Sequence, residues 1–158
     1  MTGPELVAAP GRQEIVMTCV FDAPRELVFR AWTDPKDIDR WWGPDGFTTT
    51  TNEMDVRPGG VWRFVMHGPD GVDYPNRIVY EEIVRPERLV YTHDSDQDDD
   101  PARFQVTVTF AEAVGKTHLT VRMTFASAAE RDRVVREFRA IEGGQQTLER
   151  LAQYLAKV

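Results

Sequence analysis

Cysteine, basic residues and long apolar runs are all scarce in this chain, and each shortage excludes a class of protein. Cys19 is the single cysteine among 158 residues, so no internal disulfide can form, which is typical of a reducing compartment. No apolar run reaches the length of a membrane-spanning helix, and residues 1–11 have neither the basic nor the apolar region of a signal peptide. We therefore expect a cytoplasmic protein.

The shortage of positive charge excludes two kinds of partner. The sequence has 19 Lys and Arg against 26 Asp and Glu, which gives a formal net charge of −7. A negative surface repels both phosphate backbones and anionic lipids. We therefore expect neither nucleic-acid binding nor membrane binding.

The motifs of several common chemistries are also missing. The chain has no Gly-x-Ser-x-Gly elbow, no zinc-spaced set of His and Cys, and no glycine-rich phosphate loop. The acidic segment Asp94–Asp100 begins like a calcium loop, but Asp99 stands where that loop needs Gly and Gln105 where it needs Glu. We expect no metal, no cofactor and no recognisable catalytic residue, and we interpret the acidic segment as a solvated, self-repelling loop.

What the chain does have is a regular succession of alternating apolar stretches. Two short helices follow the first of them, with Pro24 in the first turn of one and Asp34 capping the other. Ser127 opens a capping box before one long terminal helix whose apolar residues share a face. The economical packing is an α+β fold, a curved antiparallel sheet of about seven strands wrapped around that helix. The expected strands cover residues 13–21, 47–56, 60–67, 76–84, 88–94, 104–110 and 119–125. We expect a single domain over residues 12–158, preceded by a disordered tail over residues 1–11.

Tryptophan is concentrated in one part of the sequence. Trp41 and Trp42 run into a turn, and Trp62, Phe64 and Met66 alternate along the strand that comes next but one. Such a gathering of large side chains builds either a deep core or an apolar pocket, and the sequence leaves both open for each aromatic.

Five sets of residues carry a family resemblance: Ala23–Pro35, Arg40–Pro44, Pro58–Gly60 with Trp62 and Phe64, Arg85–Thr92, and Gly143 with Leu148–Leu155. They resemble the START-like (SRPBCC) superfamily, and within it the branch of homologues of the activator of the ATPase of the ninety-kilodalton heat-shock protein. The resemblance runs from about Gln13 to Val158 and implies the helix-grip fold, which hosts binding proteins, cyclases and chaperone regulators. Relatives usually have Trp directly after the residue that corresponds to Gly143, whereas this chain has Gly144. The missing side chain predicts a widened cavity; a kink or a close approach of helix and sheet is the alternative.

The candidate binding residues all belong to the expected inward face of the sheet or to the terminal helix. His93 is the unusual member, because it shares a strand face with Leu89 and Tyr91. With Tyr80 and Glu82 it predicts a polar trio in the pocket, and a solvent-facing His at a strand end is the alternative. The full set is Trp42, Trp62, Phe64, Met66, Tyr80, Glu82, Tyr91, His93, Phe104, Met123, Phe138, Ile141 and Gly144.

Three functions follow from this set. The first is a binding protein for a small hydrophobic or aromatic ligand held between sheet and helix. The second is an enzyme of the cyclase or aromatase kind, in which His93, Tyr80 or Glu82 moves protons in the same pocket. The third is a co-chaperone that contacts a heat-shock ATPase through its surface. Whether the chain forms a homodimer stays open.

Overall fold

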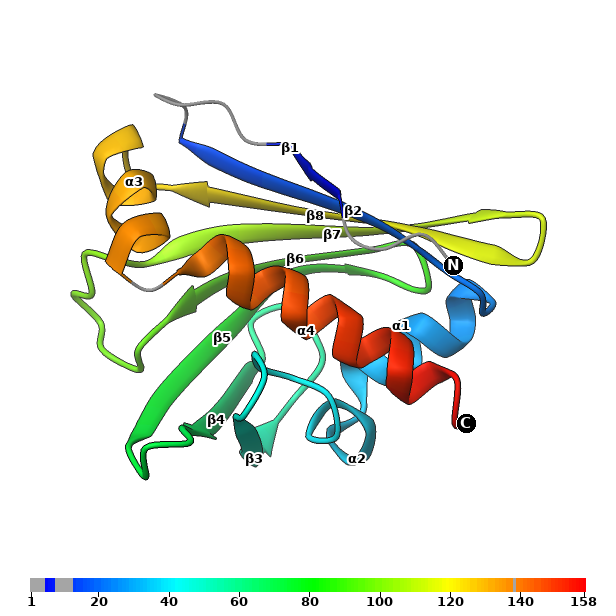
Figure 1. The fold of residues 1–158 in the computed structure, drawn as a ribbon, viewed down its shortest axis with the longest axis horizontal. Helices are drawn as coiled ribbons and strands as arrows, with labels where there is room; N and C mark the ends of the chain where they lie inside the picture. Colours follow the sequence, from blue (N-terminus) through cyan, green and yellow to red (C-terminus); the bar gives the residue numbers. More distant parts are fainter. Residues whose placement is uncertain (1–4, 8–12, 138) are drawn as a thin grey trace.

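The alternating stretches form one curved antiparallel sheet, shown in Figure 1. The computed structural model describes residues 5–7, 13–137 and 139–158. The sheet has eight strands in the order β1-β2-β8-β7-β6-β5-β4-β3. The strands are β1 (Glu5–Val7), β2 (Glu14–Phe21), β3 (Thr48–Met54), β4 (Val61–His67), β5 (Asp73–Val84), β6 (Arg88–Asp94), β7 (Phe104–Ala113) and β8 (Lys116–Phe125).

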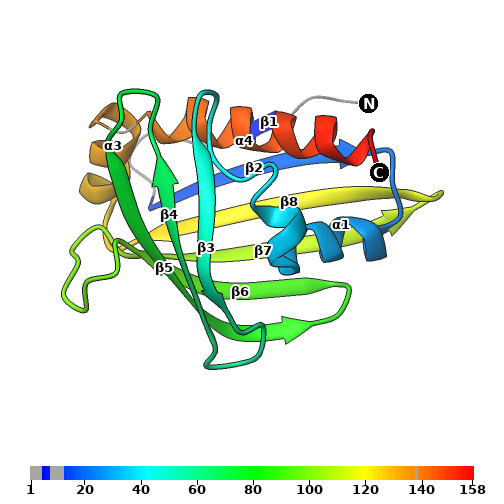
Figure 2. The same ribbon diagram turned by 90° about the horizontal axis from the view of Figure 1, so that it is seen from below.

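Four helices accompany the sheet. α1 (Arg25–Thr33) and α2 (Pro35–Ile38) follow β2, while α3 (Ala128–Glu137) and α4 (Ala140–Leu155) follow β8. Figures 1 and 2 show α4 lying along one face of the bent sheet, which we call the inner face. The predicted α+β helix-grip architecture is therefore confirmed.

Strand register explains why the inner face forms the core. In one row of paired residues, Leu119 lies between Phe110 and Cys19, and all three are buried. The next positions along the strands turn to the other face and are mostly polar, for example Thr109 and Thr120. One buried and one wet face is the usual pattern of an antiparallel sheet covered on one side.

The helix caps expected at Asp34 and Ser127 are both present. The Asp34 side chain accepts a hydrogen bond from the Lys36 amide at 2.9 Å, with Pro35 at the first helical position. The Ser127 hydroxyl accepts one from the Glu130 amide at 3.1 Å. At α1, Pro24 itself is the N-cap, without a side-chain cap bond.

The long terminal helix of the sequence prediction is two helices. Arg139, between them, has a left-handed backbone with φ 51° and ψ 46°, which a continuous helix cannot contain. The break has a packing reason, because α3 contacts β8 and β2 whereas α4 runs along the inner face.

The predicted disordered tail also differs from the structure where it is described. Glu5–Val7 pairs antiparallel with β2 as the short edge strand β1, and residues 1–4 and 8–12 lie outside the described residues. Backbone pairing at a sheet edge needs no apolar alternation, so the sequence pattern carries no signal for it.

Candidate functional site

The aromatic cluster predicted as a pocket wall is solid core. Trp42, Trp62 and Phe64 are at most 9% exposed. The Trp62 and Phe64 rings stack at 3.9 Å between centroids, and Trp42 meets Trp62 edge-on at 5.0 Å. Tyr80 and Tyr91 are buried beside them in an edge-on pair at 6.3 Å. Trp42, Trp62 and Phe64 thus contact one another, the two tyrosines pair with each other, and all five side chains are buried as in a packed interior.

The other predicted wall residues on the inner face are only half-buried. Two of them, His93 and Phe104, pair with each other where β6 finishes and β7 begins. Phe138, predicted for the same wall, lies outside the described residues. Besides Glu82 and Gly144, the half-buried members of the predicted set are Met66, His93, Phe104, Met123 and Ile141.

Helix α4 shows the same change of burial along its length. Its second half is sealed against the sheet by Leu148, Leu151, Ala152 and Leu155, all buried. None of residues 140–147 is buried. A Cβ atom placed on Gly144 would stand 3.9 Å from the Met123 methyl carbon, so this first half of α4 shares one end of the inner face with the half-buried side chains of the sheet. Met66 belongs to the same region, because its methyl carbon lies against Gly43 in the turn whose Pro44 adjoins Gly143. We call this region the open end.

The turn after Trp42 is attached to α4 by polar contacts. Arg150 donates from one guanidinium nitrogen to the carbonyls of Gly43 and Pro44, at 2.7 and 3.0 Å. The Gln146 side-chain carbonyl accepts from the Asp45 amide at 3.1 Å. The connection into β3 thus borders the helix that covers the inner face.

Gly144 does not border an open space. A Cβ atom placed there would stand 2.5 Å from Cε and 2.8 Å from Sδ of Met17, a fully buried residue of β2. The expected widening of the cavity is therefore wrong at this position, and the alternative of a close helix–sheet approach holds. The Met17 thioether occupies the space that a side chain would take, so a larger residue at this position has to displace the end of that side chain.

The predicted polar trio is not assembled either. A bulge between Tyr80 and Glu82 shifts the register of β5 against β6. Glu82 thereby turns to the outer face, where it forms an ion pair with Arg88. Parity along a strand changes at a bulge, which is why alternation alone misplaced Glu82.

His93 has a different partner, which the sequence analysis missed. Its Nε2 lies 2.8 Å from Oδ1 of Asn76 on β5. Phe64 and Phe104 flank the imidazole, with ring centroids at 5.8 and 5.0 Å. A signal was available, because Asn76 alternates with Ile78 and Tyr80 and so shares their face.

Burial controls the protonation of the inner-face groups. It lowers the pKa of His93 to about 4, against the opposing charges of Asp94 and Asp100, so the ring is neutral near pH 7. It also raises the pKa values of the Tyr80 and Tyr91 phenols. Burial, followed by the charge of Glu149, raises the pKa of Cys19 to about 11, so this thiol is protonated and unreactive, as expected of a buried structural cysteine.

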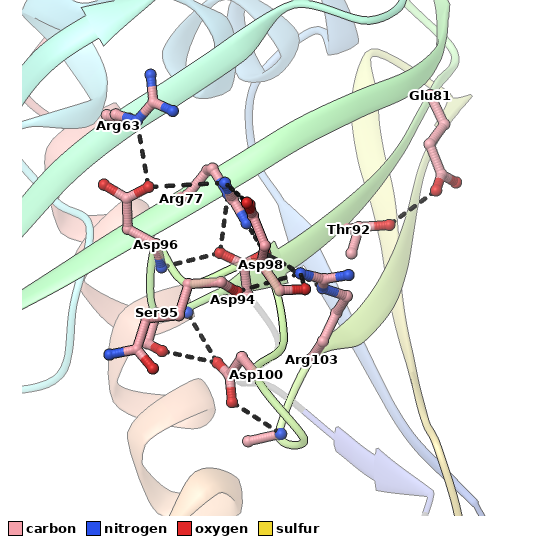
Figure 3. A network of polar contacts seen from close by, with 12 residues as sticks. Arg63, Arg77, Glu81, Thr92, Asp94, Ser95, Asp96, Asp98, Asp100 and Arg103 are labelled. Atoms are coloured by element: carbon pink, nitrogen blue, oxygen red, sulfur yellow. Dashed lines mark hydrogen bonds and ion pairs between the residues drawn. The ribbon is translucent and has the colours of Figure 1, made fainter.

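The acidic segment is an ordered part of a charged network on the outer face. Figure 3 shows Arg77 among the carboxylates of this segment. Its guanidinium contacts Asp94 at 2.8 Å and Asp98 at 2.9 Å, and Arg103 also contacts Asp94. The Asp94 side chain is only 2% exposed. The expectation of a self-repelling loop is therefore wrong at Asp94 and Asp98, which pair with arginines from β5 and from the residue before β7. Residues 96–99 are exposed to solvent, as expected.

The outer-face hollow beside this network is structural. Arg77, Val79, Thr92, Asp94, Asp98 and Arg103 line it. Its charged groups pair with one another, so we assign them to holding the strands together.

In residues 5–7, 13–137 and 139–158, no group of three or more His, Cys, Asp or Glu is placed to hold a metal ion. No helix of the described chain is long and apolar enough to cross a bilayer.

Comparison with known families decides the relationship. A model of the family described as activator of Hsp90 ATPase homolog 1-like protein matches residues 22–156. The chain belongs to this family. The family is part of the START-like superfamily, so the resemblance inferred from the sequence is confirmed.

Solved structures of similar length share the fold of this chain. A Mycobacterium smegmatis protein has 25% identity and a TM-score of 0.86, covering 97% of either chain. A Chromobacterium violaceum protein has 28% identity and a TM-score of 0.78, covering 89% of this chain and 95% of that one. A Silicibacter pomeroyi protein that carries the family's name has 24% identity and a TM-score of 0.74, covering 90% of this chain and 97% of that one. No curated protein matches the chain.

Proposed function

We propose that this family member binds a small, largely apolar or aromatic molecule at the open end of the inner face. One observation carries the proposal: the part of α4 whose residues are not buried lies at the same end as the half-buried side chains of the inner face. Met66, Phe104, Met123 and Ile141 stay half-buried there, while the other end is closed by aromatic side chains and Leu residues. A ligand that covers these side chains gains the free energy of removing their apolar surface from water, roughly 25 cal/mol per Å².

Methionine is well suited to such a surface. Met66 comes from β4 and Met123 from β8, so the two thioethers approach the open end from different parts of the sheet. Flexible Met side chains adapt to ligands of different shape. His93 and Asn76 add one hydrogen-bonding group to this apolar surface, an arrangement typical of small-molecule sites.

A methyl-labelled NMR titration tests the proposal. With 2-naphthol as probe, the methyl signals of Met66, Met123 and Ile141 should shift and saturate together. Those of Ile38, the buried last residue of α2, and Met54, on β3, serve as controls in the same spectra and should stay in place. Shifts that do not saturate, or that leave the three open-end methyls unchanged, would contradict the proposed site.

A matched pair of variants sharpens the test. Ile141→Ala removes apolar surface at the open end and should weaken probe binding about ten-fold. Glu142→Ala changes the adjacent, exposed residue of α4 and should leave the dissociation constant unchanged. Equal effects of the two substitutions would show that the helix face toward the sheet is not the binding surface.

A further inference from the structure

A short relay of hydrogen bonds determines which nitrogen of His93 carries the proton. The Asn76 amide nitrogen donates to the Tyr74 backbone carbonyl at 2.9 Å. A carbonyl only accepts, so the NH₂ group of Asn76 must point toward Tyr74 and its oxygen toward His93. That oxygen lies 2.8 Å from Nε2 and also only accepts. The proton of the ring is therefore on Nε2.

The other ring nitrogen is left as an acceptor. A neutral imidazole has a single N–H, and the low pKa of about 4 keeps His93 neutral near pH 7. Nδ1 then carries an unshared electron pair. Among the described residues, Asn76 is the one hydrogen-bond partner of the ring, and it uses Nε2.

The surroundings select what can approach this acceptor. The aromatic rings of Phe64 and Phe104 flank the imidazole, and Asp94 and Asp100 are the charges that act on it. A carboxylate ligand, ionised near pH 7, has no proton to donate to Nδ1. An aromatic molecule with an O–H or N–H group packs on the rings and supplies the missing donor.

We propose that His93 Nδ1 is the specificity-determining acceptor of the site, and that the ligand is a neutral aromatic molecule carrying a hydroxyl or ring N–H donor. This inference rests on the proposed function, because it places the donor end of the ligand at the open end. It goes further in naming the chemical class: phenols and related donors are preferred over their alkylated analogues and over aromatic acids.

The first test needs no ligand. Imidazole nitrogen spectra of the full chain at pH 7 should show His93 protonated at Nε2 and bare at Nδ1. Asn76→Leu removes the group that selects this tautomer, so the variant should show a mixture of the two forms. A wild-type ring protonated at Nδ1, or at both nitrogens, would overturn the inference.

The second test compares two probes that differ in one hydrogen-bond donor. 2-Naphthol should bind wild-type protein about five-fold more tightly than 2-methoxynaphthalene, the worth of one neutral hydrogen bond. His93→Phe should abolish this preference. His118→Phe, a matched change on the outer face of β8, should retain it. Should His93→Phe not fold, the imidazole nitrogen spectra of the wild type take its place: 2-naphthol should shift the Nδ1 resonance of His93, and an unchanged resonance at saturation would refute the inference.

The outcomes separate the inference from the proposed function. If both naphthalenes shift the open-end methyls with equal affinity, the binding site stands and the acceptor role of His93 is refuted. If neither probe shifts them, the proposed function fails and the inference fails with it. A preference for 2-naphthol that survives His93→Phe would place the acceptor elsewhere and also refute the inference.

Discussion

At the scale of single residues, the two adjacent glycines of α4 differ in the space that is available for a side chain. A Cβ on Gly143 would meet Pro44 at 3.7 Å, an ordinary contact, whereas one on Gly144 would overlap the Met17 thioether. Neighbouring positions of one helix can therefore respond to the same substitution in opposite ways. The difference comes from the sheet and not from helix propensity.

Alanine substitutions at these glycines measure that difference. Gly143→Ala should raise the free energy of unfolding by about 0.5–1 kcal/mol through helix propensity. Gly144→Ala should gain nothing or lose stability, because Met17 has to move within a packed interior. Urea denaturation of both variants gives the comparison.

A bulkier residue makes the test decisive. Gly144→Trp should lose several kcal/mol or fail to fold, because the ring meets the sheet directly. Wild-type stability of the Trp variant would show that space exists beside Gly144 after all.

At the scale of elements, the break between α3 and α4 lets the end of the chain cover two surfaces. α3 packs on β8 and β2, and α4 then runs along the inner face. Arg139 supplies the change of direction with a left-handed backbone, which costs an L-residue roughly 1–2 kcal/mol. The arrangement leaves the first half of α4 only partly covered, which is what produces the open end.

Glycine at this break should relieve the backbone cost. Arg139 is exposed, so Arg139→Gly loses no buried packing and should stabilise the protein by about 1 kcal/mol. Glu149→Gly, at an exposed position inside α4, serves as the control and should cost about 1 kcal/mol. Thermal unfolding should move the two midpoints in opposite directions; a lower midpoint for Arg139→Gly would contradict the left-handed geometry.

At the scale of the whole molecule, the outer face is held by charge and the inner face by apolar packing. Arg77 on β5, Asp94 at the end of β6 and Arg103 before β7 join three strands through one buried carboxylate. Arg63 on β4 extends the network through Asp96 in the loop. The acidic segment thus links β4, β5, β6 and the start of β7 on the outer face.

Two aspartates of the acidic segment should contribute unequally to stability, because they differ in burial. Asp94→Asn removes a buried partner of two arginines and should cost about 3 kcal/mol. Asp98 also contacts Arg77, but its side chain is 95% exposed, so Asp98→Asn should leave stability nearly unchanged. Denaturant unfolding of the pair checks this, and similar losses at both positions would show that burial of Asp94 is not what matters.

Much of this architecture is determined by the sequence alone. Alternation places Leu119, Val121 and Phe125 on the covered face of β8, and the caps at Asp34 and Ser127 start two helices where they are expected. These features depend on residues a few positions apart, so a linear pattern contains them. The family resemblance is readable for the same reason, since its motifs are short and contiguous.

Other features depend on contacts between distant segments, and only the tertiary structure decided them. The β5 bulge turned Glu82 outward, Met17 of β2 filled the space beside Gly144, and arginines ordered the acidic segment. Which aromatics are core and which border the open end depends on how far α4 seals the sheet. Burial is a property of the assembled layers, whereas periodicity belongs to a single strand, and that is why the sequence identified the inner-face residues without dividing core from candidate site.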